Sequence, residues 1–329
     1  MTSLPDQLLA ALTECPQLPA TLAARLGLHP DKLADLALQL QALGVPLEHL
    51  VQGYALRPGT PTPAALRAAG FSGTYRYLPQ VTSTQDELRR WADDPADPAP
   101  VGAALLAESQ LAGRGRRGRV WQTAGGEDDP SSLKTAAGLT FSVLLAPQHL
   151  GRLPLLPLAA GVALREACLE CLPAAAEPPG LKWPNDLITE DGRKLAGILL
   201  EAEVRGGSVR RAVLGIGLNV TAAPPGAVGL ADLAPGHVFR RAELLAAILR
   251  ALGGWLSAPD AEILGGWRIA NRTLGRRVQV QTSGGPVSGQ AQRLTDSGEL
   301  QVVTDAGKVL MIGAGDVELI GELAAGTER

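Results

Sequence analysis

The chain has 329 residues, enough for roughly two or three domains of ordinary size. Hydrophobic residues make up 46% of it and charged residues 19%, and its Gly and Pro content is below that of disordered sequences, so a small single module and a disordered chain are both excluded. With 30 Lys and Arg against 33 Asp and Glu, the net charge is −3, which excludes a general electrostatic attraction to nucleic acid or to an anionic membrane.

The sequence has none of the features expected of an exported or membrane-spanning protein. Cys15, Cys168 and Cys171 are too few for a disulfide framework, and the first residues lack a basic segment followed by an apolar run. The most apolar stretch, 153–164, is shorter than the about 20 residues that a membrane span needs. We therefore expect a cytoplasmic protein without membrane contact, in which this stretch is a buried helix.

Residues 1–60 predict three short helices followed by a short strand and a turn. Leu residues share one face in each helical segment, and Gly27 and Gly44 are expected to end the second and third helices. This order resembles a winged helix-turn-helix, which is a DNA-binding module. However, three basic residues against five acidic ones are unfavourable for phosphate contacts. The alternative interpretation is a small helical domain that supports packing or dimerisation.

The rest of the chain predicts a linker and two further domains. Residues 61–73 are rich in Pro and Ala and predict the linker. Residues 74–270 alternate extended apolar segments with helical patterns, including a capped helix at 82–92, which is typical of a mixed α/β domain. Residues 271–321 change to short alternating strands separated by Gly-containing turns and predict a small β-barrel. The expected fold class is therefore α+β.

The segment GRGRRG at 113–118 matches the GxGxxG pattern of dinucleotide-binding turns, but its context excludes that function. The next residues, RVWQTAGG, are too rich in Gly to begin the helix that such a turn requires. A Walker loop is excluded because no Gly-Lys-Ser/Thr follows. Flexible glycines and four guanidinium groups predict instead a loop that binds phosphate or carboxylate. A solvated basic patch or an RNA-contacting segment is the alternative.

Further cations and amides lie at or near the ends of other predicted strands. KWPND at 182–186 combines a lysine with an amide and a carboxylate, and RKLAGI at 193–198 adds two cations. GIGLNV at 215–220 places Asn219 after small residues that leave room for a flat ligand. Clustered cations without a metal cage predict a nucleotide phosphate substrate. Cys168 and Cys171 have no second pair of ligands nearby, so we expect them in the core and expect no metal site.

Five motifs, in their order and spacing, resemble those of biotin protein ligases: TSTQ at 82–85, LAGRGRRGRVW at 111–121, LKWPNDL at 181–187, RKLAGILLE at 193–201 and GIGLNV at 215–220. The resemblance covers nearly the whole chain and is to the bifunctional ligase/repressor type. It implies an N-terminal winged helix-turn-helix at 1–60, a biotin/lipoate ligase-like catalytic domain at 74–270 and an SH3-like β-barrel at 271–321.

The resemblance also implies the reaction, an ATP-dependent and AMP-forming ligation. Biotin and ATP with Mg²⁺ give biotinyl-5′-AMP and pyrophosphate. A lysine in the biotin carrier domain of acetyl-CoA carboxylase or a related carboxylase then attacks the mixed anhydride. The implied ligands are therefore ATP, Mg²⁺ and the substrate biotin, and the implied partner is the carrier domain; a homodimer is a candidate assembly.

Residue roles are carried over from the family motifs. The expected catalytic residues are Lys182 and Arg116. The residues expected to bind biotin or the adenylate are Ser83, Thr84, Gln85, Gln110, Arg114, Gly115, Arg116 and Lys182. Secondary candidates are Gly113, Arg117, Gly118, Arg119, Trp121, Asn185, Asp186, Lys194, Gly197 and Asn219, with Asp186 acting through magnesium. Two departures from the pattern are Gln85, where the family commonly has Asn, and an acidic stretch at 125–138 that predicts an inserted surface loop.

Two other functions stay open. A biotin-responsive DNA-binding transcriptional regulator is based on the winged-helix pattern alone and would add DNA as a partner. A lipoate or octanoyl ligase would share the fold, but the arginine loop together with KWPND favours the biotin branch.

Overall fold

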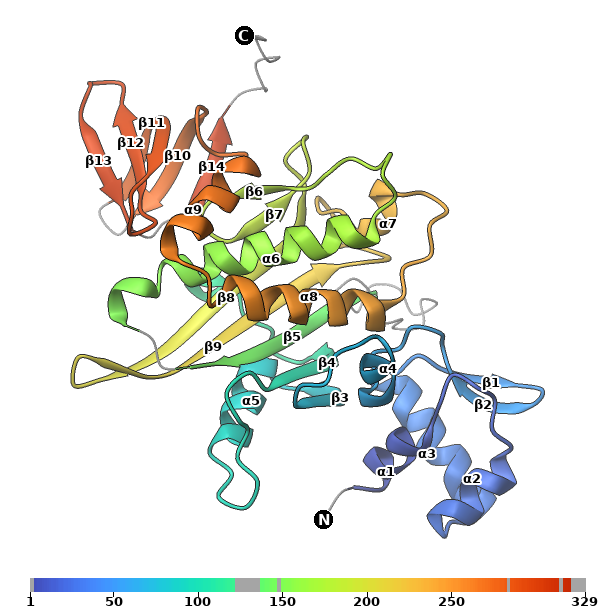
Figure 1. Ribbon diagram of the computed structural model, residues 1–329. Helices are drawn as coiled ribbons and strands as arrows, with labels where there is room; N and C mark the ends of the chain where they lie inside the picture. Colours follow the sequence, from blue (N-terminus) through green and yellow to red (C-terminus); the bar gives the residue numbers. More distant parts are fainter. Residues whose placement is uncertain (1–2, 122–136, 147–148, 283–284, 314–315, 321–329) are drawn as a thin grey trace.

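The computed structural model describes residues 3–121, 137–146, 149–282, 285–313 and 316–320 (Figure 1). These residues form a two-stranded sheet, a seven-stranded sheet and a five-stranded sheet. Figure 1 shows the N-terminal helices and the C-terminal sheet at opposite ends of the molecule, with the seven-stranded sheet and its helices between them. Most of the predicted loop at 125–138 lies outside the described residues.

The N-terminal part contains three helices and a hairpin. Their bounds are α1 (Leu4–Ala11), α2 (Pro19–Leu26), α3 (Pro30–Ala42), β1 (Leu47–Leu50) and β2 (Gly53–Leu56). Each helix has a proline in its first turn, where the missing N–H costs no hydrogen bond. Gly27 ends α2 in the left-handed conformation, as predicted. The buried Leu residues of the three helices pack against one another and form the core of this part.

The segment predicted as a linker contains a short helix, α4 (Pro63–Ala68). The Thr62 hydroxyl accepts a hydrogen bond from the Ala65 N–H at 3.2 Å, and Leu66 is buried. Just before α4 the chain is attached to the central domain. The Glu14 carboxylate accepts from the Gly59 N–H at 2.7 Å and pairs with Arg240 at 3.0 Å.

The central domain is built on a mixed sheet with the order β3-β4-β5-β9-β8-β7-β6. The strand bounds are β3 (Tyr75–Val81), β4 (Ala104–Gln110), β5 (Gly138–Leu145), β6 (Gly180–Lys182), β7 (Asp186–Ile188), β8 (Lys194–Arg205) and β9 (Ser208–Asn219). Within this sheet β3 and β4 are parallel, and the other neighbours are antiparallel. A parallel pair needs a crossover, and the predicted helix at 82–92 supplies it as α5 (Thr84–Ala92).

Helices cover both faces of the central sheet. Their bounds are α6 (Leu155–Cys171), α7 (Leu230–Leu233), α8 (Arg241–Trp255) and α9 (Asp260–Ile269). Successive strand side chains point to opposite faces, and on β5 Leu144 joins the cluster that contains Leu88 and Trp91 of α5, whereas Phe141 belongs to the main core. The main core lies under α6 and α8, which pack against each other across the other face (Figure 1). Of the helices described, none has the length and apolar composition of a membrane span.

The C-terminal part is an antiparallel sheet with the order β13-β12-β11-β10-β14. Its strands are β10 (Arg277–Thr282), β11 (Gly285–Leu294), β12 (Leu300–Thr304), β13 (Val309–Ile312) and β14 (Asp316–Ile320). The first four coincide with the predicted strands. Trp183, in the turn between β6 and β7, joins this sheet to the central domain because its indole N–H donates to the Gly298 carbonyl at 2.9 Å and its backbone N–H donates to the Thr273 hydroxyl at 2.9 Å.

Candidate functional site

A cavity of about 130 Å³ lies on the α5 side of the central sheet. Its walls come from the start of α5, the loop 111–121 that follows β4, and strands β5, β7, β8 and β9. Four of the five sequence motifs therefore contribute directly to one cavity, and the fifth, KWPND, contributes its last two residues. The cavity is smaller than most ligand pockets, which measure roughly 300–1,000 Å³.

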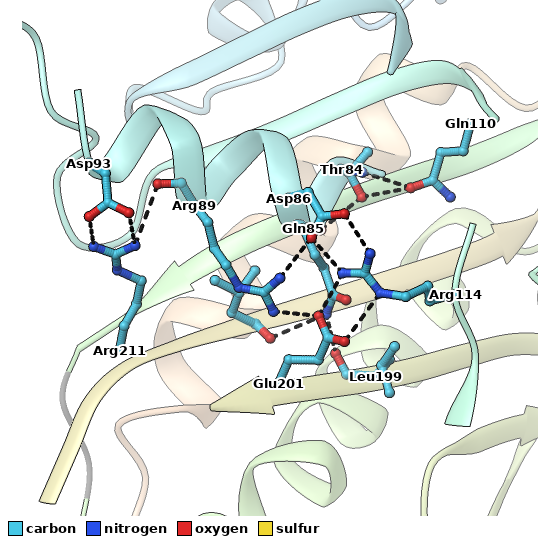
Figure 2. A network of polar contacts seen from close by, with 12 residues as sticks. Thr84, Gln85, Asp86, Arg89, Asp93, Gln110, Arg114, Leu199, Glu201 and Arg211 are labelled. Carbon is cyan, nitrogen blue, oxygen red and sulfur yellow. Dashed lines mark hydrogen bonds and ion pairs between the residues drawn. The ribbon is translucent and has the colours of Figure 1, made fainter. Parts of the chain in front are cut away.

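The first turn of α5 supplies buried neutral polar groups to the cavity. Ser83, Thr84 and Gln85 are each no more than 3% exposed, although the Ser83 side chain makes no capping hydrogen bond. The Gln110 amide oxygen accepts from the Thr84 N–H at 2.8 Å and from its hydroxyl at 3.1 Å, and that hydroxyl lies 2.8 Å from the Ser142 hydroxyl (Figure 2). These contacts fix a set of donors and acceptors that suits an uncharged polar ligand group.

Two glycines of β9 form the floor of the cavity. Gly215 and Gly217 are two residues apart on a strand, so their missing side chains leave space on the same face of the sheet. A Cβ atom on Gly215 would lie 2.9 Å from the Gln85 amide nitrogen, and one on Gly217 would lie 2.2 Å from the Trp121 indole. The side chains of Gln85 and Trp121 thus occupy the space above this floor, which accounts for the small volume of the cavity.

Trp121 also has an unsatisfied polar group. Its indole N–H is buried and has no hydrogen-bond partner among the residues described. Gln85, in contrast, donates its amide N–H to the Leu199 carbonyl at 2.9 Å and so connects α5 with β8 (Figure 2). Burying an indole N–H without a partner is unfavourable, so Trp121 offers a free donor to a ligand.

Cations and amides occupy the side of the cavity formed by β7 and β8. The Lys194 ammonium lies 2.7 Å from the Asp186 carboxylate and 5.7 Å from the centre of the Trp121 ring. Arg116 donates to the Asn185 amide oxygen at 3.2 Å, and Asn185 in turn donates to the Ile198 carbonyl at 2.7 Å. The neutral groups of α5 and the cations Arg116 and Lys194 are therefore held by different elements around the same cavity.

The arginine loop, residues 111–121, contains one 3-10 turn at Arg116–Gly118, and backbone hydrogen bonds join its two sides. The Gly115 N–H donates to the Arg119 carbonyl at 2.7 Å, and the Trp121 N–H donates to the Gly113 carbonyl at 3.0 Å. Within the described residues 111–121 no α-helix begins, so GRGRRG itself does not open the helix that a dinucleotide-binding turn requires.

An ion-pair network attaches this loop to α5 and β8 (Figure 2). Arg114 donates to both oxygens of Asp86, at 2.6 and 2.8 Å, and to both oxygens of Glu201, at 2.9 and 3.2 Å. Arg89 completes the network by donating to Asp86 at 2.8 Å and by pairing with Glu201. The hydrogen bond from Arg114 lowers the pKa of Asp86. Burial alone would raise the pKa of Glu201, but hydrogen bonds from Arg114 and Arg89 outweigh it, so that pKa is also lowered.

Most of the predicted site residues line the cavity. They are Ser83, Thr84, Gln85, Gln110, Arg114, Gly115, Arg116, Arg119, Trp121, Asn185, Asp186, Lys194 and Gly197. Lys182, Gly113, Arg117, Gly118 and Asn219 do not line it. The Asn219 amide instead donates to the Val228 carbonyl at 3.2 Å, and Lys182 is the last residue of β6.

Other cavity residues were absent from the predicted site. They are Val120, Thr140, Phe141, Ile198, Leu199, Gly215, Ile216 and Gly217. The spacing of the two glycines in GIGLNV is a signal that could have identified the floor, because alternate strand residues share a face. Thr140 and Phe141 belong to a strand without any motif, so only the position of β5 beside β9 places them in the cavity.

Comparison with known proteins supports the family that the motifs suggested. Residues 77–219 match the biotin/lipoate A/B protein ligase family, and residues 273–320 match the biotin protein ligase C-terminal domain. A biotin–acetyl-CoA-carboxylase ligase of Mycobacterium tuberculosis is 35% identical over 245 residues, which cover 72% of this chain and 86% of that protein. The bifunctional ligase/repressor BirA of Bacillus subtilis is also 35% identical, over 45% of this chain and 41% of its own length.

Solved structures agree with these sequence matches. The biotin protein ligase from Aquifex aeolicus, in a complex with biotin and ATP, has a TM-score of 0.59 and 29% identity to this chain. The match covers 76% of this chain and 99% of the Aquifex chain. The fold, the order of the motifs and the long match to a curated ligase all point to one family. This chain is a member of the biotin protein ligase family.

Proposed function

We propose that this protein activates biotin as biotinyl-5′-AMP with ATP and Mg²⁺, and then transfers biotin to a lysine of a carrier domain. One observation carries the proposal. A single cavity combines neutral hydrogen-bonding groups at the start of α5 with the cations of Arg116 and Lys194 on its other side. This arrangement suits a ligand with an uncharged polar head and an anionic reacting end.

In the first step the biotin carboxylate attacks the α-phosphorus of ATP, and pyrophosphate leaves. Ser83, Thr84 and Gln110 would hydrogen-bond the biotin head, with Gln85 supporting them from beneath. Negative charge develops on phosphate oxygens, so fixed cations and correct positioning supply the catalysis and no enzyme nucleophile is needed.

Arg116 and Lys194 are suitable cations for this step, because both line the cavity beside the neutral polar groups. Lys182 remains a candidate from the family motif, but it stands outside the lining of the cavity. Mg²⁺ would arrive with ATP, and Asp186, a carboxylate that lines the cavity, would help to hold it. Asp186 pairs with Lys194 at 2.7 Å, so its carboxylate is held beside a cation of the same cavity.

In the second step a lysine amine attacks the acyl carbon of the adenylate, and AMP leaves. The adenylate must stay bound until the acceptor arrives, and the arginine loop with Gly115, Arg116 and Trp121 would cover it. The acceptor would be the biotin carrier domain of a carboxylase, and the reaction would take place in the cytoplasm.

We also infer that residues 1–60 are a winged helix-turn-helix and that the C-terminal sheet is an SH3-like barrel. Three helices followed by the β1–β2 hairpin support the first inference, and five antiparallel strands support the second. The winged helix makes a biotin-responsive DNA-binding regulator, acting as a homodimer, the second candidate function. The excess of acidic over basic residues in 1–60 disfavours it.

The ligase proposal is tested by measuring pyrophosphate release from MgATP with biotin, with lipoate and without either acid. We expect release only with biotin, followed by AMP formation and labelling when an isolated carrier domain is added. Release with lipoate alone would instead favour the lipoate ligase alternative, and release with neither acid would overturn both. DNA binding is tested separately with operator-length duplexes at low salt and saturating biotinyl-AMP. If no duplex binds under these conditions, the role as a DNA-binding regulator is excluded.

A further inference from the structure

Arg114 has almost no hydrogen-bonding capacity left for a substrate. A guanidinium group has five N–H donors, and in Arg114 the donor nitrogens make four hydrogen bonds to the carboxylates of Asp86 and Glu201 (Figure 2). Each carboxylate is held by two parallel bonds, the geometry in which arginine binds anions most strongly. Although the family motif suggested that Arg114 contacts the ligand, its partners in this structure are two side chains of the protein.

The two carboxylates come from two of the elements that border the cavity. Asp86 lies in the first turn of α5, one residue after Gln85, and Glu201 lies on β8, two residues after Leu199. Arg89 bridges the same two carboxylates from the next turn of α5. Two arginines and two carboxylates form a network with no net charge, so the network can persist beside an anionic ligand without repelling it.

Arg114 is at the base of the arginine loop. It forms an antiparallel bridge with Val120, and the backbone bonds between Gly115 and Arg119 and between Gly113 and Trp121 join the two sides of the loop. A shift of Arg114 would therefore move both sides of the loop together. Arg116 is two residues beyond this anchor, and Trp121 follows Val120 on the opposite side of the loop. Both line the cavity.

We propose that Asp86 and Glu201 are positioning residues, which hold the arginine loop over the cavity by binding Arg114. Arg114 acts through the loop and does not touch the substrate. The inference rests on the proposed ligase function for its catalytic consequence, but the positioning of the loop itself can be tested without any ligand.

The network is suited to hold a loop without dominating the stability of the whole protein. Its side chains are between 29% and 37% exposed, and ion pairs with this exposure contribute little to global stability. A four-member network with bidentate geometry is, however, the kind of surface ion pairing that can stabilise the position of a nearby loop. We therefore expect its loss to release the loop while the domain stays folded.

A matched control lies on the same helix. Asp93 follows the last turn of α5 and binds Arg211 of β9 through both of its oxygens (Figure 2). This pair has the same chemistry and connects the same helix to the sheet, but neither residue lines the cavity or contacts the arginine loop. Asp93→Asn should therefore reproduce any general effect of removing an ion pair from α5.

The first experiment measures trypsin cleavage of the folded protein without ligands. Trypsin cuts after arginine, and the loop holds four arginines, so cleavage at residues 114–119, identified by mass spectrometry, reports the opening of the loop. We expect Asp86→Asn and Glu201→Gln to speed this cleavage by roughly fivefold or more. We expect Asp93→Asn to leave it unchanged and Asp86→Glu, which keeps the charge, to restore most of the protection. Equal cleavage rates in all the variants would overturn the proposal.

The second experiment follows the reaction. If the network positions the loop, the neutral variants should release biotinyl-AMP roughly tenfold faster, while the KM for biotin changes less than twofold. A change in the KM for biotin alone would contradict the proposal, because it would mean that Arg114 acts in ground-state binding of biotin. If cleavage responds as expected but no variant, nor the original protein, forms an adenylate, the proposed function fails and the positioning role stands. If the adenylate forms and cleavage does not respond, the positioning role alone fails.

Discussion

The buried ion pair between Arg241 and Glu108 gives a sharp prediction about stability. Arg241, the first residue of α8, donates to Glu108 of β4 at 2.7 and 2.9 Å and to the Gly138 carbonyl of β5 at 3.1 Å. The two side chains are 8% and 1% exposed, and the Tyr77 hydroxyl also donates to Glu108. Burial lowers the pKa of Arg241, but the Glu108 carboxylate outweighs this effect and holds that pKa above its usual range.

Replacing Arg241 by Met would leave a carboxylate in the core with Tyr77 as its remaining donor among these residues. Removing one partner of a buried pair costs about 3–5 kcal/mol, because the other charge stays buried without compensation. We therefore expect R241M to lower the free energy of unfolding by that amount. The double variant R241M/E108Q removes the stranded charge and should recover more than half of the loss.

Urea unfolding, followed by both circular dichroism and tryptophan fluorescence, measures this effect. The matched control is Arg250→Met on the same helix, whose pair with Glu170 is 45% and 59% exposed and should contribute no more than about 1 kcal/mol. A loss of under 1 kcal/mol in R241M, equal to that of the control, would refute the reasoning. So would a double variant less stable than R241M, since it would show that the stranded carboxylate is not the cause.

Four further predictions concern the site and the arginine loop. Arg116→Gly should loosen the retention of the adenylate, so bystander proteins become biotinylated in a labelling assay; unchanged selectivity would contradict the role of that arginine. Lys194→Gln should reduce kcat for adenylate formation at least tenfold, measured as pyrophosphate release, because a fixed cation at the developing charge is removed; a purely raised KM would argue against this role. Gly217→Ala should weaken biotin binding roughly tenfold in a calorimetric titration, because its Cβ would lie 2.2 Å from the Trp121 indole; unaltered affinity would mean that this floor does not bind the ligand. Finally, since the pKa of Asp86 lies below its ordinary value of 3.8, protection of the arginine loop from a protease active in acid should be complete above about pH 4 and decrease as the pH falls through the lowered pKa. Asp86→Asn should show a smaller change, because only Glu201, whose pKa is also lowered, is left to titrate in the network.

The local features of the site could be predicted from the sequence. A Thr-Ser-Thr segment before a polar helical pattern predicts the start of α5, and the repeated Gly and Arg residues predict a loop. Both predictions use only the properties of neighbouring residues. The glycine pair in GIGLNV marks open space on one face of a strand for the same reason. Short elements with weak patterns, such as α4 in the supposed linker and the last strand β14, could not be predicted in this way.

The choice between two lysines depends on the order of the strands, which the sequence does not contain. Lys182 stands at the end of one predicted strand and Lys194 at the start of another, and the motifs favour the first. In the structure, β6 is the edge of the sheet while β8 lies next to the glycine floor on β9, so Lys194 reaches the cavity. Contacts between residues far apart in the sequence also depend on how the strands are ordered. Arg114 meets Glu201 because the loop after β4 crosses over β8, and no local pattern predicts that contact.

The measurement that tests the central claim most directly is a calorimetric titration of the purified protein with biotin, then with biotin and MgATP, followed by mass spectrometry of the bound ligand. We expect biotin to bind alone and biotinyl-5′-AMP to be recovered when MgATP is present. Biotin bound without any adenylate would contradict the ligase activity and indicate a sensor, and no binding of biotin would contradict the proposed substrate altogether.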